Sequence, residues 1–189
     1  MKKAYLFLAD GFEEIEGLTV VDILRRAGVD ICTVSIMGKK EITGAHQIEV
    51  KADALYEECR FADGDMFILP GGMPGTRYLG EHQGLCQLLK EKADDGVALA
   101  AICAAPSVLG DLGLLQGKKA ICYPGFESRL AGATVTFEKV VTDGNITTSM
   151  GMGTAIPFAL RLVTELIGEK TAHEVKDSIR YGHLSALKG

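Results

Sequence analysis

The sequence predicts an α/β fold in which a doubly wound, mostly parallel sheet is covered by helices on both faces. Three observations support this class. Apolar strand patterns alternate with helical patterns along the whole chain. The run Ala4–Ala9 is apolar throughout, which is typical of a strand buried on both faces of a parallel sheet. The chain has 189 residues, 47% apolar and 24% charged, which suits one domain over residues 1–189.

Strands are expected where short apolar or β-branched runs stop at glycine, proline or polar residues. In chain order these runs are Ala4–Ala9, Val29–Ile36, Met66–Leu69, Val97–Ile102, Lys118–Cys122, Val135–Val141 and Ile146–Ser149. Helices are expected where apolar residues recur at helical spacing. In chain order these segments are Glu14–Ala27, Leu85–Ala93, Ala105–Leu115, Ala155–Ile167 and Thr171–Arg180. In the first helix we expect the apolar face to carry Ile15, Leu18, Val21 and Leu24, with a stop at Gly28.

Composition excludes several classes of partner. The net charge is −5, and the basic residues cluster only at Arg25-Arg26 and Lys118-Lys119, so we expect no nucleic acid as primary partner. No apolar run approaches the roughly 18–20 residues that cross a bilayer, so we expect no membrane association. The N-terminal apolar stretch is short and lacks a cleavage site, so the expected compartment is the cytoplasm.

The cysteines and histidines give no metal-binding pattern. The five cysteines are an odd number without a CxxC pair, which argues against a disulfide framework and a zinc ribbon. The histidines form no HxxxH or HxH pair; they are His46, His82, His173 and His183. We therefore expect no metal site.

Three segments follow predicted strands directly: Asp10–Glu16, Pro70–Gly75 and Cys103–Pro106. Open α/β sheets bind and react at the carboxyl ends of their strands, so a site is expected where these segments converge. Cys103 stands between a strand and a helix with small residues around it, as in a nucleophile elbow. The helix N-terminus there favours the thiolate. The alternative is a buried small hydrophobe, which is what we expect Cys32 and Cys122 to be.

The two neighbouring segments each allow two interpretations. Glu16 lies one turn into the first helix, near the crevice and on the face shared with apolar positions such as Val20. A desolvated carboxyl there could stay protonated and hydrogen-bond a thiolate, or could simply complement the helix dipole. The Gly71-Gly72 turn supplies positive φ angles, or in addition backbone N–H groups that form an oxyanion hole facing Cys103. The segment starting at Gly151 is a close-packed turn or lines the same cleft.

Taken in order, several stretches resemble the ThiJ/PfpI superfamily, in the branch of the Parkinson-disease deglycase and its bacterial relatives. The stretches are Leu8–Glu16, Arg25–Gly28, Leu69–Gly72, Ala100–Pro106 and Gly151–Thr154. The resemblance implies a flavodoxin-like fold, a homodimer, Cys103 as nucleophile and Glu16 as its protonated partner. It also implies that Gly71, Gly72 and the Ala104 N–H surround the cysteine. Tyr123, Gly151, His46 and Arg26 are further candidate pocket residues.

Two departures from the family pattern bear on mechanism. Tyr123 occupies a place where the Parkinson-disease protein has a histidine, so an acid–base role there is lost or passes to a phenol. Ala104 occupies the place where the protease-like branch has a histidine, which argues against peptidase activity. His46 stands where the Parkinson-disease protein has an arginine that reaches toward the partner's site, and its role stays open.

The resemblance leaves three hypotheses for function. The first is a cofactor-independent glyoxalase or deglycase that acts on small α-oxoaldehydes such as methylglyoxal, or on their early glycation adducts. The second is an oxidative-stress sensor or redox-regulated chaperone that uses Cys103 without turnover. The third is a structural dimer with a vestigial site.

Overall fold

The computed structural model describes residues 1–182, built around a seven-stranded sheet in the order β10-β11-β7-β6-β1-β2-β5. Its strands are β1 (Lys3–Leu8), β2 (Asp30–Ser35), β5 (Ala54–Leu55), β6 (Met66–Leu69), β7 (Ala98–Ile102), β10 (Val140–Asp143) and β11 (Ile146–Ser149). All neighbouring strands are parallel except β10, which runs antiparallel to β11. The predicted α/β class with a mostly parallel sheet is confirmed.

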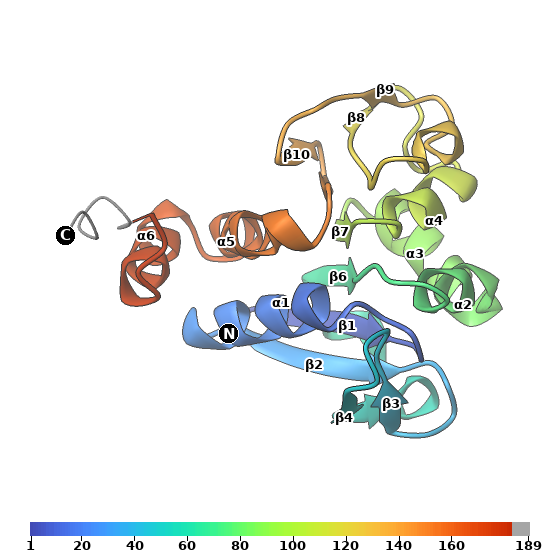
Figure 1. The fold of residues 1–189 in the computed structure, drawn as a ribbon, viewed down its shortest axis with the longest axis horizontal. Coiled ribbons are helices and arrows are strands. Elements are labelled where there is room, and N and C mark those ends of the chain that lie inside the picture. The colour runs from blue at the N-terminus through green and yellow to red at the C-terminus, as the bar shows by residue number, and fades with distance from the viewer. Residues whose placement is uncertain (183–189) are drawn as a thin grey trace.

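Helices cover both faces of this sheet (Figure 1). One face carries α1 (Glu14–Arg26), α5 (Ala155–Leu166) and α6 (Glu169–Ser178), which share one apolar core. The other face carries α2 (Gly75–Glu81), α3 (Gln83–Asp94) and α4 (Pro106–Asp111), which share a second core. Single turns of 3₁₀ helix lie at Tyr56–Glu58, Phe61–Asp63, Glu127–Arg129 and Met152–Thr154. No helix within residues 1–182 is long and apolar enough to cross a membrane.

The order of the strands places the three predicted site segments together. The chain runs outward from β1 to β2 and β5, then returns to β6 and continues outward through β7 to β11. The winding direction therefore changes between β1 and β6, which is where open α/β sheets place their binding crevice. The loops after these two strands touch, because the Glu13 N–H donates to the Gly71 carbonyl oxygen at 2.9 Å.

Two predicted elements are wrong in extent. The strand expected at Val135–Val141 is two strands in different sheets. β9 (Thr134–Val135) pairs with β8 (Lys119–Ala120), whereas β10 joins the main sheet. Phe137, between them, is 90% exposed and so lies in neither core. The helix expected at Ala105–Leu115 ends at Asp111, and Gly113 follows with a left-handed φ of 79°.

The sequence pattern also missed short elements and assigned part of the wrong face of one helix to the core. The antiparallel hairpin of β3 (Glu41–Thr43) and β4 (Glu49–Lys51) was not predicted, nor were β5 and α2. In α1 the predicted apolar face is partly wrong, since Ile15 and Leu18 are 49% and 40% exposed. The buried face runs instead through Glu16, Val20 and Leu24, which follow one another at a spacing of four residues.

Candidate active site

Cys103 lies in the turn between β7 and α4, where the sequence predicted the change from strand to helix. β7 ends one residue before it, and its own φ is 67°, a left-handed conformation that costs a non-glycine residue about 1–3 kcal/mol. Two backbone hydrogen bonds hold it there. Its N–H donates to the Ser149 carbonyl at 3.0 Å, and its carbonyl accepts from the Tyr123 N–H at 2.7 Å. The strained backbone is therefore fixed from both sides, and the thiol is partly exposed at the edge of the sheet.

Glu16 reaches the thiol from the buried face of α1. The residue is 1% exposed, its Oε2 accepts the Gly71 N–H at 2.9 Å, and its carboxyl forms a side-chain hydrogen bond with Cys103. Oε1 has no hydrogen-bond partner among the described residues. Burial raises the pKa of this carboxyl to about 7, which brings its titration to neutral pH. Of the two interpretations of Glu16, the geometry favours the carboxyl partner of the cysteine.

The turn after β6 requires its glycines because neighbouring residues approach this backbone too closely for a side chain. A Cβ on Gly71 would lie 2.5 Å from both the Cys103 Cβ and the Glu16 Oε2, so no larger residue fits between thiol and carboxyl. Gly72 has a φ of 91°, and its N–H together with that of Ala104 points at the Cys103 sulfur. The Gly71 N–H bonds Glu16, so Gly72 and Ala104 supply the donors that face the sulfur.

The charge state of Cys103 differs from the sequence expectation. Burial raises the pKa of its thiol to about 12, and the charge and hydrogen bond of Glu16 add to the rise. The Gly72 and Ala104 N–H groups lower this pKa, but burial outweighs them. The expectation that the helix N-terminus produces a low thiol pKa is therefore wrong while Glu16 is ionised.

Whether Glu16 stabilises or destabilises a thiolate on Cys103 depends on whether the Glu16 carboxyl is protonated. An ionised carboxylate repels a thiolate, whereas a carboxylic acid donates a hydrogen bond that stabilises it. Above a pH of about 7 the two groups together hold one proton, which can lie on the sulfur or on the carboxyl. This arrangement allows the thiol to pass its proton to Glu16 when the sulfur forms a bond.

A small cleft opens beside this pair. It has a volume of about 280 Å³ and is lined by Tyr123, Pro124 and residues 150–154. Tyr123 is 51% exposed, and its ring lies against Gly151, where a Cβ would be 3.3 Å from it. A Cβ at Gly151 would also be 3.8 Å from the Glu16 Oε1. The structure therefore places Tyr123 and Gly151 next to the carboxyl oxygen that lacks a partner.

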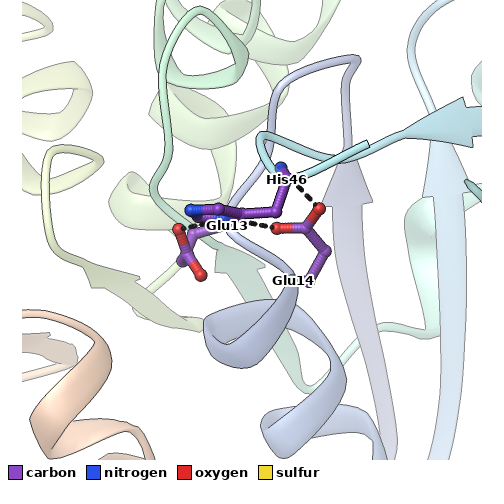
Figure 2. A group of neighbouring side chains, drawn as sticks. All are labelled: Glu13, Glu14 and His46. Atoms are coloured by element: carbon purple, nitrogen blue, oxygen red, sulfur yellow. Dashed lines mark hydrogen bonds and ion pairs between the residues drawn. The ribbon is translucent and has the colours of Figure 1, made fainter. Parts of the chain in front are cut away.

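His46 lies on the hairpin loop between β3 and β4 and is held by two carboxylates, Glu13 just before α1 and Glu14 at its first residue (Figure 2). Its main-chain N–H donates to the Glu14 Oε1 at 2.8 Å, and its Nδ1 lies 3.0 Å from Oε2 and 3.6 Å from Glu13. These acids raise the pKa of His46, Glu14 first and Glu13 second. The potential ligand atoms of Glu13, Glu14 and His46 all lie within 4.8 Å of one another. These three residues form the only group within residues 1–182 that could hold a metal ion, and His183 lies outside the described residues.

Arg26 lies elsewhere. It is in the last turn of α1, whereas Glu16 is in the first, and the rise of a helix separates these positions by about 15 Å. Its guanidinium pairs with Asp22 at 2.8 Å, and it lines a different cleft with Leu18 and Arg180. The structure does not bring Arg26 to Cys103.

Sequence reasoning missed residues that support the site through their backbone or through a neighbour. Ser149 accepts the Cys103 N–H, and Glu14 holds His46. Ser149 ends a predicted strand that pairs with the strand before Cys103, so the pairing of the two strand ends was the signal for it. Glu14 gave no signal, because acidic residues are common in a first helical turn.

The chain matches the model of the DJ-1/PfpI family over residues 2–165. The chain belongs to this family. It is 39% identical to protein DJ-1 homolog B of Arabidopsis thaliana over 176 residues, which are 92% of this chain and 40% of the plant protein. It thus spans less than half the length of that relative. It is 34% identical to the Parkinson disease protein 7 homolog of Danio rerio over 179 residues, which cover 93% and 95% of the two chains.

The solved structures agree with the sequence comparison. The structure of oxidised Toxoplasma gondii DJ-1 superposes with a TM-score of 0.93 at 33% identity, covering 96% of this chain and 100% of the other. The DJ-1/PfpI relatives include an enzyme, the isonitrile hydratase of Pseudomonas putida, which is 32% identical over 142 residues, 74% of this chain and 61% of that protein. The predicted superfamily is therefore confirmed.

Proposed function

We propose that the protein is a cofactor-independent glyoxalase or deglycase that acts on methylglyoxal-type α-oxoaldehydes or their early glycation adducts. The observation that supports this most directly is the buried pair of Cys103 and Glu16. A carboxyl with a pKa of about 7 is suited to move protons in both directions at neutral pH, which the isomerisation of an α-oxoaldehyde requires.

In the first step the Cys103 sulfur adds to the aldehyde carbon, and its proton passes to the Glu16 carboxylate. The Gly72 and Ala104 N–H groups, which face the sulfur, stabilise the oxyanion that develops beside it. Glu16 then protonates this oxygen and forms a hemithioacetal. The bond from sulfur to carbon makes the adduct intramolecular, so the following proton transfers need no second encounter.

In the second step Glu16, again ionised, removes the proton from the former aldehyde carbon and returns it to the neighbouring carbon, while the hydroxyl proton of the hemithioacetal moves to the neighbouring carbonyl oxygen. The product is a thioester of a 2-hydroxy acid on Cys103. Water hydrolyses the thioester, and the net reaction adds one water to the oxoaldehyde and releases the 2-hydroxy acid. Amine or thiol adducts enter by the same route, with the amine or thiol as leaving group and the cleft beside Tyr123 available for the attached group.

The experiment is NMR detection of lactate formed from methylglyoxal in a buffer without amines. We expect turnover in the wild type and none in Cys103→Ser. In Glu16→Gln we expect a loss of about 10²- to 10⁴-fold, the usual contribution of a positioned acid–base group. Cys86→Ser is the matched control, because Cys86 is a partly exposed thiol on α3 that bonds the Leu79 and Gly80 carbonyls. Equal turnover in Cys103→Ser and in the wild type would rule out the proposed mechanism.

A second candidate function is redox sensing through the same cysteine. It is favoured by the partly exposed Cys103 thiol next to a carboxyl that can donate a hydrogen bond to an oxidised sulfur, and by the Toxoplasma relative that was solved in an oxidised form. This function predicts that peroxide oxidises Cys103 to the sulfinic acid selectively while the buried Cys122 stays reduced, in a protein without glyoxalase turnover. Mass spectrometry of the tryptic peptides measures both residues.

The homodimer implied by the family resemblance stays a proposal. The exposed apolar side chains Ile15 and Leu18 on α1 are the places to test it. We expect Leu18→Glu to convert a dimer to a monomer in size-exclusion chromatography with light scattering. A wild type that is already monomeric contradicts the proposal.

A further inference from the structure

Two other cysteines, far apart in the sequence, meet at the edge of the sheet. Cys32 lies in β2, and Cys59 follows the turn Tyr56–Glu58 that continues from the neighbouring edge strand β5. The Cys32 thiol hydrogen-bonds to the Cys59 sulfur. The Cys59 thiol also reaches the Leu55 carbonyl at 3.4 Å, whereas the contact of Cys32 with the Thr33 carbonyl is long, at 3.9 Å. The two side chains are therefore neighbours at this edge of the sheet.

Both thiols are accessible from solvent. Each is partly exposed, and both line one surface cleft of about 500 Å³, together with Lys3, Glu58 and Arg60. Their other side packs against the core that contains Tyr5 and Phe61. The expectation that Cys32 is simply a buried hydrophobe is thus wrong, whereas Cys122 is buried as expected. A small reagent in the cleft can reach both sulfurs.

The surroundings distinguish the two thiols. Burial raises the pKa of Cys32 to about 11, and the charges of Cys59 and Asp53 raise it further. Burial and then the charge of Glu58 raise the pKa of Cys59 as well, but the hydrogen bond with Cys32 and the charges of Lys3 and Lys40 act against that rise. Cys59 is therefore the better attacking thiol, and Cys32 is placed to attack the Cys59 sulfur once Cys59 carries an adduct.

We propose that Cys32 and Cys59 form a second thiol site, a pair that is converted reversibly to an intramolecular disulfide by exchange with a low-molecular-weight disulfide. The Cys59 sulfur attacks one sulfur of the reagent, the S–S bond of the reagent breaks, and one thiolate leaves. The Cys32 sulfur then attacks the Cys59 sulfur, and the second thiolate leaves. The two protons go to the departing thiolates, the protein pair loses two electrons, and the reagent gains two.

Cys103 provides the internal contrast. The main influences on its sulfur are burial, the Glu16 carboxyl and two N–H groups, and none of these is a thiol. A mixed disulfide on Cys59, by contrast, is attacked by Cys32 at a high effective concentration. The proposal does not depend on the chemistry of the Cys103 site.

The experiment equilibrates the full chain with glutathione and glutathione disulfide at several ratios, quenches with acid, alkylates the free thiols and identifies peptides by mass spectrometry. We expect a linked Cys32–Cys59 peptide in the wild type. In Cys32→Ser the mixed disulfide on Cys59 cannot be resolved, so its glutathione adduct should accumulate at least about tenfold more than in the wild type. Cys103→Ser and Cys86→Ser are the controls and should retain the linked peptide.

Two results would overturn the proposal. One is a wild type that gives no linked Cys32–Cys59 peptide at any glutathione ratio. The other is a Cys59 adduct that persists equally in the wild type and in Cys32→Ser. The linked peptide is measured in the wild type, so that result does not depend on how well a variant folds, and circular dichroism checks the fold of Cys32→Ser.

Discussion

Glu14 and Glu16 lie in the same turn of α1 and are both buried, 4% and 1% exposed, yet their pKa values move in opposite directions. Burial is the largest influence on each and favours the protonated form. Glu14 nevertheless has a lowered pKa, because it accepts hydrogen bonds from the His46 ring and from backbone N–H groups. Glu16 has a raised pKa; one of its oxygens bonds the Gly71 N–H, and the other has no partner.

The comparison shows that the depth of burial and the donors around a carboxyl together decide its charge. A carboxyl whose oxygens are all satisfied is a fixed structural anion, and here it anchors the β3–β4 hairpin to the start of α1. A carboxyl with an open oxygen next to a thiol stays close to its titration point at neutral pH. One helical turn thus supplies both a structural carboxylate and a reactive one.

The largest effect that tests this comparison is on stability. Folding raises the pKa of Glu16 from 4.5 to about 7, so the folded state binds more protons than the unfolded state between these values. Stability supplied by the protonated form is therefore complete below pH 4.5 and is lost as pH rises through 7, with an upper limit of about 3 kcal/mol. Glu16→Gln does not titrate, so its stability relative to the wild type should rise by up to this amount from pH 4.5 to 8.

Urea unfolding at pH 5 and pH 8 measures this difference. Glu14→Gln is the matched control and should show almost no change between these pH values. The lowered pKa of Glu14 stabilises the wild type above pH 4.5, and this stabilisation is lost only as pH falls below 4.5, so the gap between this variant and the wild type should be nearly the same at pH 5 and pH 8. If the gap between Glu16→Gln and the wild type is the same at both pH values, Glu16 titrates in the folded protein as it does when unfolded.

Much of this site followed from local sequence pattern. The change from strand to helix at Cys103 and the glycines after β6 marked two of the three segments that meet. The placement of Glu16 on one face with Val20 is confirmed, because both are buried in α1. Its role stayed open, since helical spacing does not tell whether a carboxyl on that face meets a thiol.

Long-range contacts between weakly patterned segments could not be predicted. His46 meets Glu14 through a hairpin of three-residue strands, which is too short to show alternation. Cys32 and Cys59 meet because β5, only two residues long, pairs with the end of β2. In both cases the position of an edge segment depends on tertiary packing rather than on its own sequence.

A smaller effect is expected at Gly71, which separates the thiol from the reactive carboxyl. The methyl group of Gly71→Ala would lie 2.5 Å from both the Cys103 Cβ and the Glu16 Oε2, and the surrounding backbone is tightly bonded. We expect a destabilisation of about 1–3 kcal/mol from overpacking, together with weaker glyoxalase turnover. Gly151→Ala is the matched control, since its Cβ meets the Tyr123 ring at 3.3 Å and this exposed ring can move. Equal stability losses in the two variants would contradict the tight packing at Gly71.

The smallest effect concerns His46, the exposed partner of the structural carboxylate. Glu14 is the main cause of its raised pKa and Glu13 the second, so NMR titration of the imidazole should show a midpoint above 6.5. Glu14→Gln should lower that midpoint more than Glu13→Gln, while Glu16→Gln should leave it in place, because Glu16 is not among the groups that shift it. A larger drop in Glu13→Gln would mean that the more exposed acid holds the histidine. Backbone N–H groups alone would then lower the pKa of Glu14. The difference between the pKa values of Glu14 and Glu16 would then come from main-chain donors rather than from the His46 ring.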